Sequence, residues 1–195
     1  RCEEFEGDVL ADASGNGRPG EIGGIVAYHL PGPDHSSFSG DSPNRSLQLA
    51  GGTVSALVPD ARSLSFWFWN GMDSTVRDNT GDLVQHGESL RLRIGGKADA
   101  GSRGSLIFQS GDHAFGGSFK LGIRAWHHVL ISRDGASVKI YLDGNPKSAP
   151  SSPKFRPARG ASVVPCPSKG GSTRSLGLGR RSPARTRNDS TQHPV

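Results

Sequence analysis

The feature that most constrains this chain is a succession of short segments with alternating polar and apolar residues between residues 45 and 145. Roughly eight such segments, each about 5–7 residues long, follow one another at a spacing typical of β-sandwiches. Turns rich in Gly, Pro and Asp separate them, and no helical period interrupts the series. The sequence therefore predicts an all-β fold of antiparallel strands.

The strongest strand signal is the sequence Ser-Leu-Ser-Phe-Trp-Phe-Trp at residues 63–69. Side chains alternate between the two faces of a strand, so Phe66 and Phe68 share one face, and Trp67 and Trp69 share the other. Large apolar groups on both faces predict either a strand that is covered on both sides or a strand with one face that lines a groove.

Two further patterns support the same fold. Residues 90–94 alternate perfectly, which predicts three apolar side chains facing inward and Arg91 and Arg93 facing outward. Residues 126–132 and 137–142 are strand-like and flank an Asp-Gly turn, which is typical of a β-hairpin.

The positive charge of the chain is concentrated near its end. Residues 1–150 carry 14 Lys and Arg against 17 Asp and Glu, whereas residues 151–195 carry nine basic residues and one acid. The main body is thus slightly acidic, and we expect no nucleic-acid partner. Residues 181–195 have almost no apolar content, so we expect a domain over residues 1–180 and a disordered basic tail over residues 181–195. No stretch approaches the ~20 apolar residues of a membrane span, so we expect no membrane insertion.

Several motifs occur in an order that resembles a known family. They are the strand at residues 63–69, Trp126-His127-His128-Val129, the hairpin that ends Tyr141-Leu142-Asp143-Gly144, and Asp12-Ala13-Ser14-Gly15-Asn16-Gly17. Over about residues 8–180 the chain resembles laminin-G-like domains of the concanavalin A-like lectin/glucanase superfamily. The resemblance is to modules of large exported bacterial proteins, such as those of planctomycetes.

The resemblance implies a jelly roll of two antiparallel sheets. It also implies a non-catalytic binding or adhesion module of a larger exported protein, located outside the cytoplasm, in the periplasm or on the cell surface. Its partners would be a glycan or an extracellular protein, together with neighbouring domains of the parent chain. The family's closing strand is replaced here by the basic segment from Arg180, so we expect a module truncated at its C-terminus.

One loop is a candidate calcium site. Asp12, Ser14 and Asn16 alternate through a Gly-rich turn and could direct several oxygens to one point, which suits Ca²⁺. Related modules often hold a structural calcium near their termini, which adds to this hypothesis. Hydrogen bonding of an Asx turn to its own backbone explains the same residues without a metal, and this interpretation is favoured.

The candidate ligand-binding residues are Trp69, Arg91 and Arg93, because sugar recognition needs aromatic faces and a few polar groups. Each has a simpler explanation. All three tryptophans of the chain lie in expected strands, where core packing is the more common role, and an Arg on an outward strand face is usually only solvated.

Catalysis is not expected. No strand carries the pair of carboxylates that a glycosidase needs, and the alternating acids Glu4, Glu6 and Asp8 lie at a terminus outside any apolar strand. His127 and His128 have no metal ligand at a suitable spacing, which favours a structural role. A glycosidase of the same superfamily and a purely structural spacer remain the alternatives. The two cysteines, Cys2 and Cys166, permit one disulfide, and their spacing does not decide whether it forms.

Overall fold

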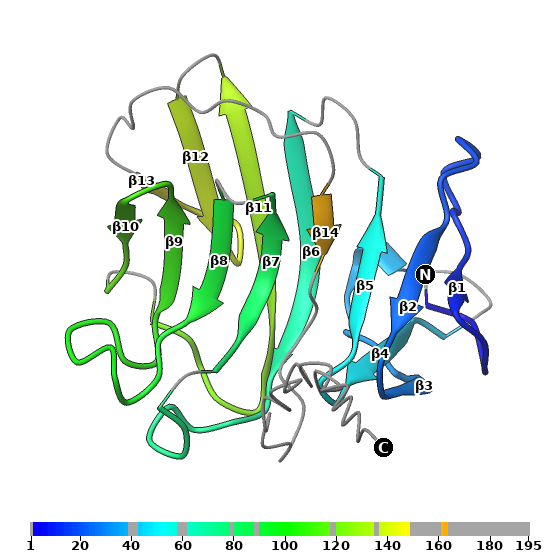
Figure 1. Ribbon diagram of the computed structural model, residues 1–195, viewed down its shortest axis with the longest axis horizontal. Coiled ribbons are helices and arrows are strands. Elements are labelled where there is room, and N and C mark those ends of the chain that lie inside the picture. The colour runs from blue at the N-terminus through cyan, green and yellow to red at the C-terminus, as the bar shows by residue number, and fades with distance from the viewer. Residues whose placement is uncertain are drawn as a thin grey trace, which may run out of the picture.

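The chain folds as an all-β antiparallel sandwich, which confirms the predicted fold class (Figure 1). The computed structural model describes residues 2–38, 43–57, 62–78, 80–87, 90–117, 120–134, 137–148 and 161–163. Over these residues the single helical element is the 3₁₀ turn η1 (Ser36–Phe38), and no helix is long and apolar enough to cross a membrane. The predicted boundary at residue 180, the tail and Cys166 lie outside the described residues.

The larger layer is an eight-stranded sheet in the order β1-β2-β5-β14-β7-β8-β9-β10. Its strands are β1 (Val9–Leu10), β2 (Gly20–Gly23), β5 (Thr53–Ala56), β7 (Asp82–His86), β8 (Leu90–Ile94), β9 (Leu106–Ser110), β10 (His113–Phe115) and β14 (Ala161–Val163). All the strand pairs in it are antiparallel. In this sheet β14 lies between β5 and β7 and pairs with both (Figure 1).

The smaller layer is a four-stranded sheet in the order β13-β12-β11-β6. Its strands are β6 (Ser63–Asn70), β11 (Ala125–Asp134), β12 (Ser137–Leu142) and β13 (Asn145–Ser148). A separate hairpin of β3 (Val26–Pro31) and β4 (Arg45–Leu49) forms a third, two-stranded sheet. The sequence predicted two sheets, whereas the structure keeps this hairpin apart. A β-bulge between Ala27 and Leu30, where His29 has a φ of 56°, makes the hairpin irregular.

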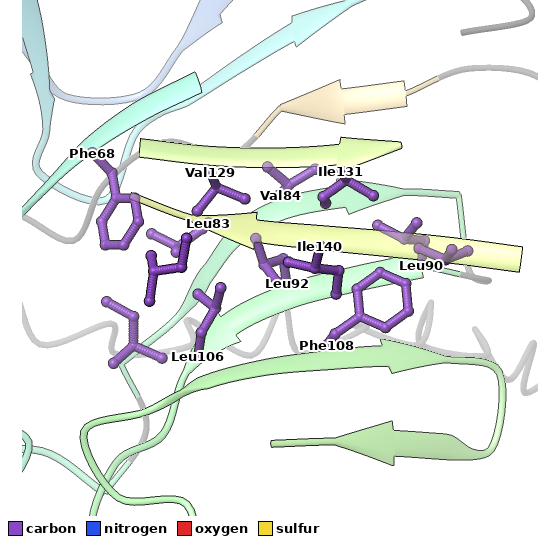
Figure 2. Packing of buried hydrophobic residues seen from close by; sticks show 13 residues of the cluster. Phe68, Leu83, Val84, Leu90, Leu92, Leu106, Phe108, Val129, Ile131 and Ile140 are labelled. Carbon is purple, nitrogen blue, oxygen red and sulfur yellow. The ribbon is translucent and has the colours of Figure 1, made fainter. Parts of the chain in front are cut away.

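The core lies between the two layers and follows the predicted alternation. Phe68, Val129, Ile131 and Ile140 from the small sheet meet apolar side chains of the large sheet (Figure 2). The large-sheet residues in this cluster include Leu83, Val84, Leu90, Leu92, Ile94, Leu106 and Phe108. Most of them are at most 2% exposed, so this core supplies the main hydrophobic stabilisation.

The turn between β12 and β13 was expected only as the end of a strand. Asp143 and Gly144 both have positive φ, of 51° and 77°, which is the backbone that a two-residue hairpin turn requires. The Asp143 backbone N–H donates to the His128 carbonyl, which holds the turn against β11.

Candidate functional site

An open pocket of about 470 Å³ lies between the β3–β4 hairpin and the β6 edge of the small sheet. We call it the aromatic groove, because Trp67, Trp69 and Trp126 line it. Its lining also includes residues 45–48 of β4, which we call the β4 wall, and Leu10 of β1 and Val54 of β5. The groove is therefore lined by both sheets of the sandwich and by the separate hairpin.

The tryptophans lie on the outer face of the small sheet. Trp69 is paired with Trp126 across β6 and β11, and their ring centroids are 5.8 Å apart in an edge-to-face arrangement. The interpretation of the tryptophans as core residues is wrong, because strand alternation turns them away from the side chains that form the core. Trp69 is 38% exposed, so it presents apolar surface to solvent inside the groove.

Trp67 is more enclosed than Trp69. Two rings pack near it: His35, just before η1, and Phe38, the last residue of η1. Their ring centroids lie 5.2 and 5.9 Å from that of Trp67. His128, its partner across β6 and β11, lies 5.0 Å away. Three rings therefore hold Trp67 in place, and Trp69 is the most exposed of the three tryptophans.

The two histidines of β11 have structural roles that match the sequence interpretation. His127 is 7% exposed and faces inward, with its Nδ1 2.8 Å from the Asp143 carboxylate and its Nε2 3.0 Å from the Gly122 carbonyl. His128 faces outward, and its Nε2 is 2.8 Å from the Ser65 hydroxyl. The Asp143 carboxylate also accepts a hydrogen bond from the His128 backbone N–H, so one turn residue orients both positions.

Arg91 and Arg93 lie on a different face from Trp69. They alternate with the buried Leu90, Leu92 and Ile94 of β8, so they point outward from the large sheet, whereas Trp69 points outward from the small sheet. Both Arg93 terminal nitrogens bind Asp99, at 2.6 and 2.7 Å, and Arg91 lies 4.0 Å from Asp82. The three candidate residues therefore do not form one site, and a ligand role for the two arginines stays a prediction.

The loop of the expected calcium site is closed by its own hydrogen bonds. Asp12 Oδ1 accepts from the backbone N–H and the hydroxyl of Ser14, and Oδ2 accepts from the backbone N–H of Arg18. Asn16 Nδ2 donates to the Ser14 hydroxyl. The Ser14 hydroxyl, with the N–H groups of Arg18 and Ser14, lowers the pKa of Asp12 to about 2.

Asp12 is the one carboxylate of this candidate set, and its oxygens accept the three hydrogen bonds just described. Among the residues that the structure describes, no group of three His, Cys, Asp or Glu is placed to hold a metal. Calcium stays a prediction, and a higher melting temperature in calcium than in EDTA would support it.

The N-terminal acids do not converge on the groove. Glu4 Oε1 accepts a hydrogen bond from the Ala11 N–H, and Glu6 and Asp8 are exposed to solvent. None of the three lines the groove.

The fold resembles a domain of known structure. That structure is domain 4 of AbnA, a GH43 extracellular arabinanase from Geobacillus stearothermophilus, in complex with arabinotriose. The match has a TM-score of 0.53 at 20% sequence identity and covers 80% of this chain and 77% of that chain. No family model matches this sequence, and neither does any curated protein sequence. At this identity the likeness shows the fold alone, and membership of the laminin-G-like family stays a prediction.

Sequence reasoning selected Trp69 but missed the other parts of the groove. Strand alternation could have identified Trp126. Val129 and Ile131 of β11 face inward, and Trp126 lies an odd number of residues from both, so it faces outward. The β4 wall, including Arg45, carried no comparable signal, because only the tertiary arrangement brings this hairpin beside β6.

Proposed function

We propose that this protein is a non-catalytic carbohydrate-binding module that holds an oligosaccharide in the aromatic groove. The observation that carries this proposal is the exposed ring of Trp69, which lies beside Trp126 in an open groove. Sugar rings have apolar faces, and ligand pockets typically combine aromatic walls with a few polar groups. Both components are present here, since Gln48 and Arg45 of β4 also line the groove.

The structural comparison supports the same class of ligand. Domain 4 of the arabinanase was solved with arabinotriose, and that enzyme is extracellular. We therefore propose that this chain acts outside the cytoplasm, as part of a larger exported protein. An adhesive role would use the same groove to bind the glycan of a glycoprotein.

The test is binding to a panel of soluble polysaccharides, with arabinan, xylan, galactan and mannan as probes in affinity electrophoresis and calorimetry. The expected result is retardation by at least one polysaccharide, which Trp69→Ala abolishes. Phe5→Ala is the matched control, because Phe5 is an aromatic side chain that is 71% exposed and lies outside the groove lining.

The same panel separates the proposal from its alternatives. Release of new reducing ends would identify an enzyme of the glycosidase type. A folded protein that binds no glycan on the panel or on a broad array would indicate a structural spacer.

A further inference from the structure

The aromatic groove has an unusual charge pattern. Among the lining residues that the structure describes, Arg45 is the one that carries a formal charge at neutral pH, and none of them is Asp or Glu. Asp34, which follows the lining residue Pro33 in the sequence, is exposed and is not part of the lining. The groove therefore favours a negatively charged ligand over a positively charged one.

Arg45 differs from the other arginines of the sandwich faces. Arg93 is neutralised by two hydrogen bonds from its guanidinium to Asp99, and Arg91 lies near Asp82. Arg45 is half-buried, and over the described residues its guanidinium has no ion pair and no hydrogen bond. A guanidinium presents five donors and is well suited to bind a carboxylate with two parallel hydrogen bonds.

The residues on either side of Arg45 in the sequence do not compete for this role. Asn44 Nδ2 donates to the Pro33 carbonyl at 3.1 Å, and the Ser46 hydroxyl donates to the Pro31 carbonyl at 3.0 Å. These side chains are used to hold the hairpin together. Arg45 is thus the strongest uncommitted donor in the β4 wall, and Trp69 lines the same groove.

From this arrangement we infer that the groove selects acidic oligosaccharides, which contain uronic acids, and that Arg45 binds the uronate carboxylate. A sugar ring rests against Trp69 while its carboxylate accepts hydrogen bonds from Arg45. This inference rests on the proposed carbohydrate-binding function and assigns its ligand class. Arabinotriose, the ligand of the similar arabinanase domain, is neutral, so the inference separates the two proteins.

The experiment compares matched ligands that differ only in charge. Oligosaccharides of galacturonate, mannuronate and glucuronate are titrated by calorimetry in native form and after reduction of their carboxyl groups to alcohols. We expect at least one native oligosaccharide to bind about tenfold or more tightly than its reduced form. Raising the NaCl concentration from 50 to 500 mM should weaken binding of the native form more than that of the reduced form.

Variants assign this preference to Arg45. Arg45→Gln should remove the difference between the native and reduced ligands, and Arg45→Lys should keep part of it, because a lysine retains charge but loses the two-pronged geometry. Arg103→Gln is the matched control and should leave the difference unchanged, because Arg103 is an exposed residue between β8 and β9 that lies outside the groove lining.

The outcomes separate this inference from the proposal beneath it. Equal binding of native and reduced ligands, still abolished by Trp69→Ala, would overturn the acidic preference and leave the carbohydrate-binding function standing. A preference that survives Arg45→Gln in a protein with an unchanged melting temperature would overturn the role of Arg45. Absence of binding to every glycan, neutral or acidic, would overturn both.

Discussion

The two faces of strand β6 show how one segment can serve two purposes. Its inward residues, Leu64, Phe66 and Phe68, belong to or pack against the closed core between the sheets. Its outward residues, Trp67 and Trp69, line the aromatic groove, and Phe68 is 1% exposed whereas Trp69 next to it is 38% exposed. Residues adjacent in sequence and similar in hydrophobicity thus contribute to the core in one case and to the proposed binding surface in the other.

The sharpest way to break this comparison is Phe68→Ala. Removal of a fully buried aromatic side chain leaves a cavity in the core and should lower the free energy of unfolding by about 3–5 kcal/mol. Urea denaturation followed by circular dichroism measures the loss. If Phe68→Ala destabilises no more than Trp69→Ala, the distinction between the two faces is wrong.

A smaller effect is expected from His127→Phe, which keeps a ring against Phe68 but loses the hydrogen bonds to Asp143 and Gly122. Each acceptor keeps a second donor, Asn70 Nδ2 for the Gly122 carbonyl and the His128 N–H for the Asp143 carboxylate, so the loss should be about 1–2 kcal/mol. His128→Phe on the outward side is the control, and urea midpoints of the two variants can be compared directly. Equal midpoints would show that the inward position of His127 has no special importance.

The outer face of the large sheet provides the next test. Asp99→Asn breaks the ion pair with Arg93. Because the side chains of Asp99 and Arg93 are only 17% and 26% exposed, the free energy of unfolding should fall by about 1–2 kcal/mol at pH 7. Asp82→Asn, at the looser 4.0 Å contact, should have little effect.

This ion pair also predicts a dependence on pH. The hydrogen bonds from Arg93 lower the pKa of Asp99 below that of the unfolded chain. A carboxyl with a lowered folded pKa contributes stability that is present above its unfolded pKa of about 4 and is lost as the pH falls through the folded value. The difference in melting temperature between the native protein and Asp99→Asn should therefore shrink below pH 4, and a constant difference from pH 7 to pH 2 would contradict this account.

The smallest effect on stability is expected from Trp69→Ala. Because the ring is partly exposed, its removal should lower the free energy of unfolding by about 1 kcal/mol or less, a shift of roughly 2–4 °C in melting temperature. The same variant should lose glycan binding. A large loss of stability would place Trp69 with the core residues and weaken the proposed function.

Much of the fold could be predicted because the strands of the core alternate clearly. Residues 90–94 show Leu90, Leu92 and Ile94 inward and Arg91 and Arg93 outward, as the period of two requires. The strands before residue 45 were not predicted, since β2 contains two glycines and an acid and gains its order from pairing with β5. At Leu83 and Val84 consecutive residues are both buried, because a bulge in β7 shifts the register.

The site was less predictable for a physical reason. Alternation separates two faces of a strand but does not state which face meets another layer, so Trp67, Trp69 and Trp126 were favoured as core residues. Other lining residues come from β4, and the strand motif at residues 45–49 contains nothing that places Arg45 in the same groove as the tryptophans.

The separate β3–β4 hairpin has a consequence for how the groove can change. In the described part of the chain no ladder of backbone hydrogen bonds ties β4 to β6, so the distance between the two walls is set by side chains and loops. An oligosaccharide bound in the groove would therefore contact two units that no such ladder joins. Under the proposed function, exchanging residues on the hairpin would be a route to new ligand preferences while the core stays intact.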